Sequence, residues 1–508
     1  MVLKGVQGFR EDYEEHILNG RCLCHLEQPV PCVALCPAGV DIPGYVALVA
    51  EGRYADAVRL IRKDNPFVTA CALVCEHPCE ARCRRNMVDA SINIRGLKRY
   101  AVDHCGVVPA PLNAPSTGKK VAIIGGGPSG LSAAYYLQLM GHQTTIFEQR
   151  QSLGGMLYYG IPSYRLPKER LAEDIDNILS TGVKVELNTS VGNGEGQIPF
   201  SKIREEYDAV YISIGAHTDK KIGIEGEDAN GVISAVELLR GIGDGYKPDF
   251  TGKTVIVIGG GNVAMDVTRS AIRLGAEKVS ILYRRRKADM TALPDEIEGA
   301  IAEGAEILEL CAPKQIEADE NGNVTAIYAD PKIIGLIDSA GRPRPANSGK
   351  DAVRIPCDII IVAIGQDIVS GHFADDGLPV NRNAIITTET GAVTGVDGVF
   401  AGGDCVTGPA TVIKAIATGK VAAANIDNYL GFHHVISVDV EIPSARLDDR
   451  PACGRVNLTE RNSNDRKKDF EICENGMSCK EATQEAMRCL RCDHFGYGVF
   501  KGGRISQW

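Results

Sequence analysis

Apolar side chains recur at helical spacing in the first hundred residues of the chain. Across residues 41–66, DIPGYVALVAEGRYADAVRLIRKDNP, they stand three and four positions apart, which predicts short helices. Every fourth position of the next segment is then a cysteine, at Cys71, Cys75, Cys79 and Cys83. One continuous helix would align them in a stripe, but Pro78 lacks the backbone N–H that a helix interior uses. We therefore expect at least part of this cysteine segment to be loop.

The pattern changes after a proline-containing segment. Residues 106–120, GVVPAPLNAPSTGKK, hold three prolines and no hydrophobic periodicity, which predicts a linker. The apolar run Val121–Ile124 predicts a buried strand, and a glycine-rich turn, a helical segment and a second strand ending at Glu148 follow it. The same order of elements recurs at residues 253–286. A third strand-like start, GVFAGG, leads to a helix from about Thr411.

The first glycine-rich turn has the dinucleotide-binding fingerprint in the context that this fingerprint requires. Gly125, Gly127 and Gly130 allow a tight turn, a close approach of the pyrophosphate and contact between helix and strand. The helix N-terminus offers N–H groups to phosphate. Glu148, at the end of the second strand, can accept hydrogen bonds from ribose hydroxyl groups.

The second fingerprint ends differently from the first. Gly259, Gly261 and Ala264 fill its glycine positions, but its second strand closes on three arginines, residues 284–286, instead of an acid. Guanidinium groups bind a ribose 2′-phosphate through charge-assisted hydrogen bonds, whereas an acid would repel it. The site therefore favours NADP(H) and leaves NAD(H) open, and the alternative is a solvated strand end. Two dinucleotide folds in one chain suggest that one nucleotide reduces the other.

The third unit carries an acid at its turn. After Gly402 and Gly403, Asp404 can bind a ribityl or ribose hydroxyl group. The helix N-terminus near Thr411 can stabilise negative charge on a reduced flavin ring. A plain turn and helix cap would use the same residues, so both interpretations stay open.

Charge and composition restrict the partners and the compartment. The formal net charge of −10 and the pI near 5.6 argue against nucleic acid or an anionic membrane as partner, because phosphate binding relies on Lys and Arg. The N-terminus lacks the apolar core of a signal peptide, and no apolar run reaches the ~18 residues of a membrane span. We therefore expect a soluble cytoplasmic protein without membrane insertion. Its 17 cysteines would stay reduced, and clustered thiols there bind zinc or iron–sulfur.

The whole combination resembles the small (beta) subunit of glutamate synthase and the related N-terminal half of dihydropyrimidine dehydrogenase, a family of NADPH-dependent FAD iron–sulfur oxidoreductases. The resemblance runs from about residue 20 to 430, on the cysteine head and the motifs GGGPSGLSAA, LGGMLYYGIPSYRLPKE, GGGNVAMD and AGGDCVTGPATVIKAI. It implies an α/β fold with two Rossmann-like dinucleotide-binding domains after a helical Cys-rich iron–sulfur domain. The implied FAD residues are Gly125, Gly127, Pro128, Ser129, Gly130, Glu148, Gly155, Met156, Gly403, Asp404, Thr411 and Val412. The implied NADP(H) residues are Gly259, Gly261, Asn262, Ala264, Arg284 and Arg285.

The implied domains follow one another along the chain. A helical Cys-rich domain binding two [4Fe-4S] clusters takes 1–115, and the two parts of an FAD-binding domain take 116–220 and 363–435. Between those parts lies an NAD(P)H-binding domain at 221–362, and a Cys-containing tail follows at 436–508.

By the family pattern, the two clusters have interleaved ligands. Cys22, Cys24 or both would join Cys32 and Cys83 on one cluster, and Cys36 would join Cys75 and Cys79 on the other. Relatives place Glu or Gln as the fourth ligand of that second cluster, where this chain has Lys98, and a protonated ammonium has no lone pair to give. Our choice for this ligand is therefore Cys71, with Cys105 as the next candidate. Zinc would also fit the number of thiols.

The tail carries a further set of four cysteines, which are Cys473, Cys479, Cys489 and Cys492. A third iron–sulfur cluster, a structural zinc and a dithiol relay through Cys489 and Cys492 are the alternatives, and we favour a metal centre.

The predicted function is electron transfer, with no side chain assigned a catalytic role. NAD(P)H would deliver hydride to FAD, and the clusters would pass single electrons to a partner subunit or protein acceptor in a hetero-oligomer. A flavin-dependent disulfide reductase that uses the Cys489/Cys492 dithiol is the rival. It is weakened because the nicotinamide fold lacks the Cys-x-x-Cys of low-molecular-weight thioredoxin reductases. A regulatory module that binds nucleotides without turnover is a third alternative.

Overall fold

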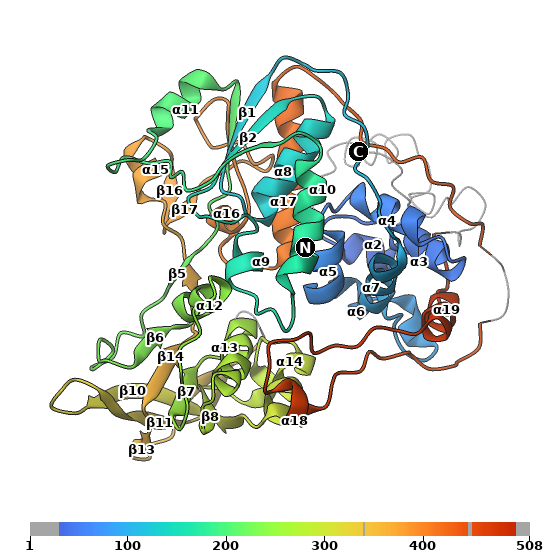
Figure 1. Ribbon diagram of the computed structural model, residues 1–508. Helices are drawn as coiled ribbons and strands as arrows, with labels where there is room; N and C mark the ends of the chain where they lie inside the picture. Colours follow the sequence, from blue (N-terminus) through green and yellow to red (C-terminus); the bar gives the residue numbers. More distant parts are fainter. Residues whose placement is uncertain (1–29, 339–340, 446–449, 494–508) are drawn as a thin grey trace.

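The fold is that of a computed structural model, which describes residues 30–338, 341–445 and 450–493. Figure 1 shows a helical domain, two domains that each contain a sheet, and a last segment that runs back across the helical domain.

The helical domain is built from short helices around one apolar core. They are α2 (Pro31–Leu35), α3 (Ile42–Ala50), α4 (Tyr54–Arg62), α5 (Val68–Val74), α6 (Pro78–Ala81), the 3-10 helix η2 (Arg84–Met87) and α7 (Ile94–His104). The short helices predicted within residues 41–66 are α3 and α4. The predicted break before Pro78 is also present, because His77 takes a positive φ of 41° between α5 and α6. Tyr45, Phe67 and Leu97 are fully buried and join α3, α5 and α7 into this core.

The first sheet domain is a parallel sheet built from two separate parts of the chain. Its strands, in spatial order, are β18 (Val399–Ala401), β4 (Ala209–Ile212), β1 (Lys120–Ile124), β2 (Gln143–Phe147) and β3 (Lys184–Glu186). Helices α8 (Pro128–Leu139) and α17 (Val412–Tyr429) pack against each other beside it (Figure 1). The remaining elements are α9 (Met156–Tyr159), α10 (Lys168–Leu179), α11 (Phe200–Glu206), α15 (Gly371–Asp375), α16 (Asp404–Thr407), β16 (Val380–Asn381) and β17 (Ala384–Ile385). Because β18 pairs with β4, a strand near residue 400 rejoins the sheet that began at residue 120.

The second sheet domain repeats the parallel arrangement and adds an antiparallel extension. Its parallel strands, in spatial order, are β6 (Val232–Ser234), β14 (Ile359–Val362), β7 (Thr254–Ile258), β8 (Lys278–Tyr283) and β9 (Glu306–Glu309). Its helices are α12 (Ala235–Gly243), α13 (Asn262–Arg273), η3 (Lys287–Asp289) and α14 (Pro294–Glu303). The extension contains β10 (Cys311–Ala318), β11 (Val324–Ile337), β12 (Pro343–Asn347) and β13 (Val353–Pro356). The predicted fold class, two Rossmann-like units after a helical domain, is confirmed.

A short antiparallel pair marks the two passages of the chain between the sheet domains. It is formed by β5 (Thr218–Asp219) and β15 (Gln366–Asp367). The second sheet domain is thereby an insertion between the two parts of the first.

The tail contacts both the second sheet domain and the helical domain. Helix α18 (Ser463–Arg466) packs on α14, and α19 (Cys479–Met487) packs on α3 and α7 (Figure 1). A capping box starts α19: the Ser478 hydroxyl accepts the Glu481 N–H, and the Glu481 carboxylate accepts the Ser478 N–H. This local signal makes α19 a well-defined helix that can present the cysteines after it.

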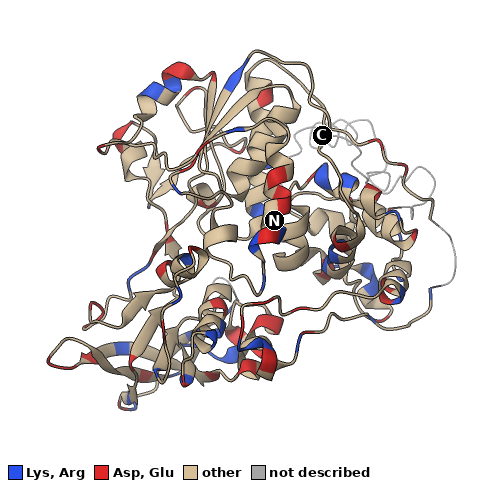
Figure 2. Cartoon of the chain, viewed as in Figure 1, with Lys and Arg blue, Asp and Glu red and all other residues tan. Residues whose placement is uncertain are grey.

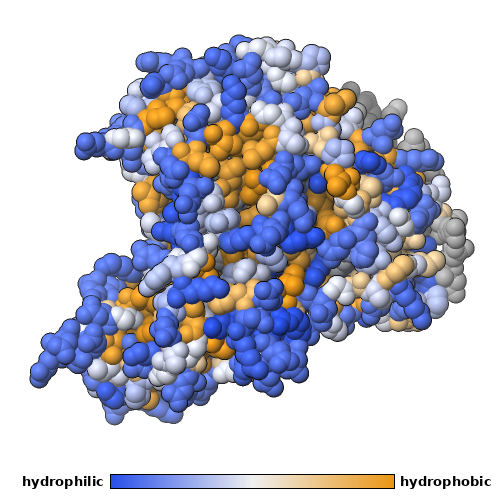
Figure 3. Space-filling view, viewed as in Figure 1, coloured by the Kyte–Doolittle hydropathy of each residue, from blue (hydrophilic) through white to orange (hydrophobic). Residues whose placement is uncertain are grey.

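Within the ranges given above, no helix is long and apolar enough to cross a membrane. Basic and acidic residues are interspersed over the whole described chain (Figure 2). The face drawn in Figure 3 is hollowed between the two sheet domains, and apolar residues gather on the wall that belongs to the first sheet domain.

Candidate functional site

A cleft of about 550 Å³ lies at the carboxyl ends of β1 and β18. The predicted FAD residues that line it are Gly125, Gly127, Pro128, Ser129, Glu148, Gly155, Met156, Gly403 and Asp404. Gly130, Thr411 and Val412 were predicted with them but do not line it. Gly130 instead lets α8 approach the turn, because a Cβ there would lie 2.0 Å from the Gly125 carbonyl oxygen. Thr411 precedes α17, whose Ala415 reaches the cleft.

Bare backbone forms one wall of this cleft. Gly155 has a φ of 53°, and a Cβ on it would lie 2.9 Å from the Cα of Gly127. Two glycine loops therefore meet where a side chain on Gly155 would collide with the backbone of Gly127. A wall of this kind, at the N-terminus of α8, fits a pyrophosphate.

Two carboxylates face the cleft from different strands. Glu148 accepts hydrogen bonds from the Gly126 N–H at 2.7 Å and the Arg150 N–H at 2.9 Å, so it holds the turn in shape. Burial raises the pKa of Glu148, against the effect of these two donors. Burial also raises the pKa of Asp404 to about 6, with the Ala410 N–H 3.2 Å from its carboxylate. Both acids keep acceptor capacity for ligand hydroxyl groups.

Four basic side chains that line the cleft were not predicted from the sequence: Arg150, His217, Arg240 and His372. The Nδ1 atom of His217 and the Nε atom of Arg150 are buried and make no hydrogen bond within the described chain. Burial, together with Arg150 and Arg240, lowers the pKa of His217 to about 4, so this imidazole is neutral at pH 7. Unpaired buried polar atoms in a cleft fit a polar ligand, because leaving them unpaired costs stability. In the sequence, the segment IGAHTDKK, which follows β4 and contains His217, was the signal from which His217 could have been predicted.

The second glycine-rich turn lies between β7 and α13. Gly259 has a φ of 147° and packs so closely that a Cβ would lie 2.3 Å from the Ala363 carbonyl oxygen. Gly261 directly precedes α13, and Ala264 is buried in the first turn of that helix. The side chain of Asn262, predicted to bind the nucleotide, is already engaged in two hydrogen bonds. Its amide donates to Glu76 at 2.7 Å, and its oxygen accepts the Leu293 N–H at 2.9 Å, so both polar groups have partners within the protein, and the nucleotide contact of Asn262 stays a prediction.

The arginines at the end of β8 differ in their surroundings. Arg285 is buried, donates to the Pro343 carbonyl oxygen at 2.9 Å and pairs with Asp338 at 3.2 Å. Its guanidinium therefore already has two partners within the protein, and its assignment to a 2′-phosphate stays a prediction. Arg284 is exposed and forms no hydrogen bond or ion pair with any residue in the described ranges. Arg284 is thus the predicted arginine whose charge stays available to a ligand.

Four buried thiols surround Lys98 in the helical domain; we call them the inner thiol set. They are Cys36, Cys71, Cys75 and Cys79. Burial lowers the pKa of Lys98, but the negative charge of these sulfurs outweighs burial and raises it. Four thiols with one buried cation fit a [4Fe-4S] cluster, which takes four thiolates. Cys105 lies apart, with its thiol near the carbonyl oxygens of Val102 and Gly106.

Four half-exposed thiols line a second, smaller cavity with mostly apolar walls; we call them the outer thiol set. They are Cys32, Cys83, Cys489 and Cys492. Helix α2 carries Cys32 toward this set and ends at Cys36 of the inner set, so one short helix serves both. The predicted ligands Cys22 and Cys24 lie outside the described residues.

Comparison with known proteins identifies the family. Residues 119–419, more than half of the chain, match the family described as pyridine nucleotide-disulphide oxidoreductase. The chain belongs to this family. Residues 8–107 match the domain described as dihydropyrimidine dehydrogenase domain II, 4Fe-4S cluster.

Individual relatives agree with this assignment. The NADP(+)-dependent formate dehydrogenase subunit beta of Moorella thermoacetica is 39% identical over 512 residues, covering 93% of this chain and 72% of the relative. The glutamate synthase [NADPH] small chain of Escherichia coli (strain K12) is 32% identical over 419 residues, covering 78% of this chain and 88% of the relative. FprA from Mycobacterium tuberculosis, solved in complex with NADPH, shares the fold with a TM-score of 0.53 at 20% identity, over 63% of this chain and 85% of that one. The predicted resemblance is confirmed, and the chain is an NAD(P)H-dependent oxidoreductase.

In this chain, the four tail cysteines do not form one site. Cys473 is buried beside Arg273, whose guanidinium lies 3.3 Å from the sulfur. Cys479 is exposed at the start of α19, beside the Tyr100 hydroxyl. Only Cys489 and Cys492 lie together, in the outer thiol set. The prediction of a separate four-thiol tail centre is therefore corrected, because the tail folds over two different domains.

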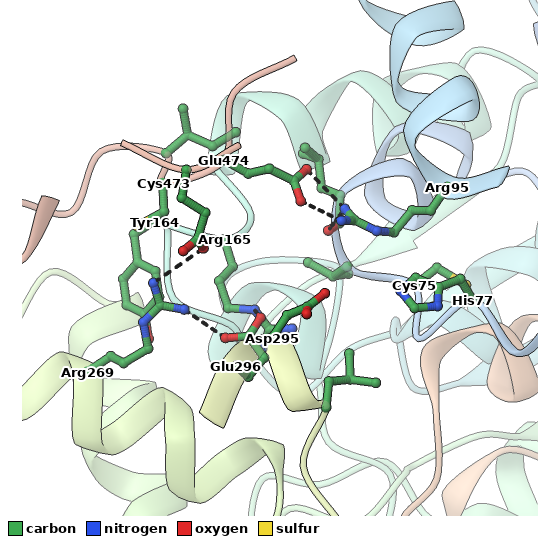
Figure 4. A pocket seen from close by; sticks show the side chains of 15 residues that line it. Cys75, His77, Arg95, Tyr164, Arg165, Arg269, Asp295, Glu296, Cys473 and Glu474 are labelled. Carbon is green, nitrogen blue, oxygen red and sulfur yellow. Dashed lines mark hydrogen bonds and ion pairs between the residues drawn. The ribbon is translucent and has the colours of Figure 1, made fainter. Parts of the chain in front are cut away.

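A network of ion pairs separates the inner thiol set from the second sheet domain of this oxidoreductase. It lines a cavity of about 70 Å³, with Cys75 and Arg95 on the helical-domain side (Figure 4). On the other side, Glu296 pairs with Arg165 and with Arg269, each at 2.8 Å. Glu296 lies in the first turn of α14, where its negative charge is favourable to the helix dipole, and these two ion pairs add to that stabilisation.

Proposed function

We propose that this chain takes hydride from NADPH onto FAD and passes single electrons, through two [4Fe-4S] clusters, to an electron-accepting protein subunit. The observation that supports this most is the presence of a glycine-walled cleft, a second dinucleotide turn and two four-thiol sets in one chain. When bound, a flavin converts a two-electron hydride into single electrons, and iron–sulfur clusters carry one electron each.

The side chains of the cleft have separate tasks in this proposal. The glycine wall admits the pyrophosphate, while Glu148 and Asp404 accept hydrogen bonds from ligand hydroxyl groups. Arg150 and His217 offer the buried polar atoms that lack a protein partner. Because His217 is neutral at pH 7, it can hydrogen-bond a flavin or nucleotide without adding charge.

The exposure of the two thiol sets suggests where electrons leave. Every cysteine of the inner set is buried, whereas every cysteine of the outer set is partly accessible. Electron transfer to another protein requires a donor near the surface, so the face around the outer set is where we expect the partner subunit to dock. The beta-subunit designation of the formate dehydrogenase relative also supports a hetero-oligomer.

The rival disulfide reductase is not favoured. Its dithiol, Cys489 and Cys492, lines the outer cavity of the helical domain, and neither residue lines the large cleft. A thiol relay needs its dithiol beside the flavin at some stage of turnover. A regulatory role without turnover would predict no bleaching of a bound flavin by NADPH.

Anaerobic purification followed by metal, flavin and kinetic measurements tests the proposal. We expect one FAD and about eight irons per chain, at four irons for each cluster. Stopped-flow absorbance should show flavin bleaching by NADPH, and low-temperature EPR of the reduced protein should show two cluster signals. Stoichiometric zinc with little iron, or a flavin that NADPH does not reduce, would refute it. Co-purification of the native protein would identify the acceptor subunit.

A further inference from the structure

The outer thiol set unites the two ends of the described chain. Cys32 lies on α2, Cys83 directly precedes η2, and Cys489 and Cys492 come from the tail. Their common cavity is walled by apolar residues, among them Ile42, Val46 and Leu490. Four thiols around a small apolar cavity are what a [4Fe-4S] cluster needs, since it takes four thiolates and tolerates little water.

The backbone between the two tail cysteines has the shape of a ligand loop. Arg491 takes a positive φ of 52°, which is unfavourable for a non-glycine residue. Its N–H donates to the Cys489 sulfur. Its side chain pairs with Asp493 at 3.0 Å, in a buried position. The loop is therefore held, at a cost, with both sulfurs on the same cavity.

Independent contacts fix the tail at this place. The Arg488 side chain is 1% exposed and pairs with Glu485 at 2.6 Å and with Asp89 at 2.9 Å. Glu485 also accepts the N–H groups of Asn93 and Val456, each at 2.7 Å. A buried pair is costly to break, so the residue before Cys489 is anchored to the helical domain without any contribution from a metal.

We propose that Cys489 and Cys492 are cluster ligands that join Cys32 and Cys83, so that the tail closes the outer [4Fe-4S] site. The inference rests on the proposed function and goes beyond it, because the ligands come from the tail and not from Cys22 and Cys24. With the tail dithiol, the described residues supply two complete four-thiol sets. The outer cluster would then cross-link the tail to the helical domain, and loading it would add to the anchoring that the ion pairs of Arg488 already provide.

Paired double variants test the ligand assignment. After anaerobic reconstitution, the Cys489→Ala/Cys492→Ala variant should lose about four of about eight irons and one of two EPR signals. Hydrogen exchange in residues 479–492 should rise. The matched controls Cys22→Ala/Cys24→Ala and Cys473→Ala/Cys479→Ala should keep about eight irons and both signals. Loss of four irons from the Cys22/Cys24 variant with retention in the Cys489/Cys492 variant would overturn the proposal, as would zinc in the outer site.

A measurement on the native protein covers the case in which the tail variant does not fold. With its metal in place, Cys489 and Cys492 should resist alkylation by iodoacetamide at least tenfold more than after oxidative removal of iron. Cys479, which is exposed and outside the set, should react at the same rate before and after. Equal reactivity of Cys489 and Cys492 in both states would overturn the proposal. If the native protein holds no iron at all, the proposed function fails as well, whereas a normal iron content with an unprotected tail refutes the ligand assignment alone.

Discussion

The amide nitrogen of Asn262 lies 2.7 Å from the carboxylate of Glu76, and this hydrogen bond joins the second dinucleotide turn to the residue after Cys75. A single hydrogen bond thus connects the second dinucleotide turn to the segment that carries Cys75 of the inner thiol set. Asn262 also accepts the Leu293 N–H, so one side chain connects α13, the start of α14 and the helical domain.

A double-mutant cycle separates this linking role of Asn262 from nucleotide binding. We expect Asn262→Ala and Glu76→Ala to lower stability by similar amounts, with a coupling of roughly 1.5–3 kcal/mol, because the bond involves a charged acceptor. The Michaelis constant for NADPH should change less than about threefold in either variant. A large rise of that constant in Asn262→Ala alone would show that the amide binds the nucleotide after all.

The arginines of β8 should divide into one that selects the nucleotide and one that supports the fold. Arg284→Gln should raise the Michaelis constant for NADPH by about tenfold or more, since one charge-assisted bond contributes roughly 1.4 kcal/mol or above. The constant for NADH should barely change. Arg285→Gln should instead lower stability, because it removes the buried ion pair that Arg285 makes with Asp338 at 3.2 Å. Equal losses for both nucleotides in Arg284→Gln would contradict the assignment.

Whether the role of one of these residues could be predicted depends on how far apart in the sequence the residue and its partners lie. Gly125, Gly127 and Glu148 could be predicted because strand, turn, helix and strand lie within about thirty residues, and the fingerprint specifies their contact locally. Arg285 could not, because its partner Asp338 comes from β11 and the turn after it, 53 residues later. A pattern of residue types cannot show which charges meet after folding.

The cysteines include one case in which the sequence was sufficient for the prediction and one in which it was not. Cys71 could be chosen over Lys98 on chemistry alone, because an ammonium cannot be a ligand, and the structure brings Cys71 together with the other inner thiols. The tail cysteines were grouped by closeness in sequence, whereas the structure separates Cys473 from Cys489 and carries Cys489 to Cys32. That contact depends on the docking of α19 on α3, more than four hundred residues apart in sequence.

Lys98 should tune the inner cluster electrostatically. It is a buried cation facing four sulfurs, so it stabilises the more negative, reduced state of a bound cluster. Lys98→Met should lower the reduction potential of that cluster by on the order of 50 mV, since ~59 mV in a one-electron couple corresponds to ~1.4 kcal/mol. Lys98→Arg, which keeps the charge, is the matched control and should shift it less. A redox titration followed by EPR gives the answer, and an unchanged potential in Lys98→Met would exclude the role.

Asp404 and Thr411 allow a direct test of which predicted FAD residues contact the ligand. Asp404 lines the large cleft and Thr411 does not. Asp404→Ala should therefore weaken FAD binding by about tenfold or more, as expected for a lost hydrogen bond to a charged group, while Thr411→Ala should change it less than about twofold. Fluorescence titration of flavin-depleted protein measures both affinities. Similar losses in the two variants would mean that the N-terminus of α17 contributes as much as the acid.

Glu303 should make the attachment of the tail depend on pH. It is buried and accepts from Arg269 at 2.7 Å and from Arg466 of the tail at 2.8 Å, with Arg273 at 2.5 Å. Burial alone would raise the pKa of Glu303, but these arginines outweigh it and lower the pKa to about 2.

Because the pKa is lower in the folded state than its ordinary value near 4.5, the stabilisation is complete above pH 4.5 and is lost as the pH falls toward 2. The loss should be about 1.4 kcal/mol per pH unit in that window, which is about a tenfold rise in local opening. Protection factors for hydrogen exchange of residues 460–474 at pH 3 to 6 measure this opening, with Glu303→Gln at the same pH as the control. The variant should have lower protection factors at pH 6 and should show no additional fall of the protection factors on acidification. Parallel pH profiles for the two proteins would place the acid-sensitive group elsewhere.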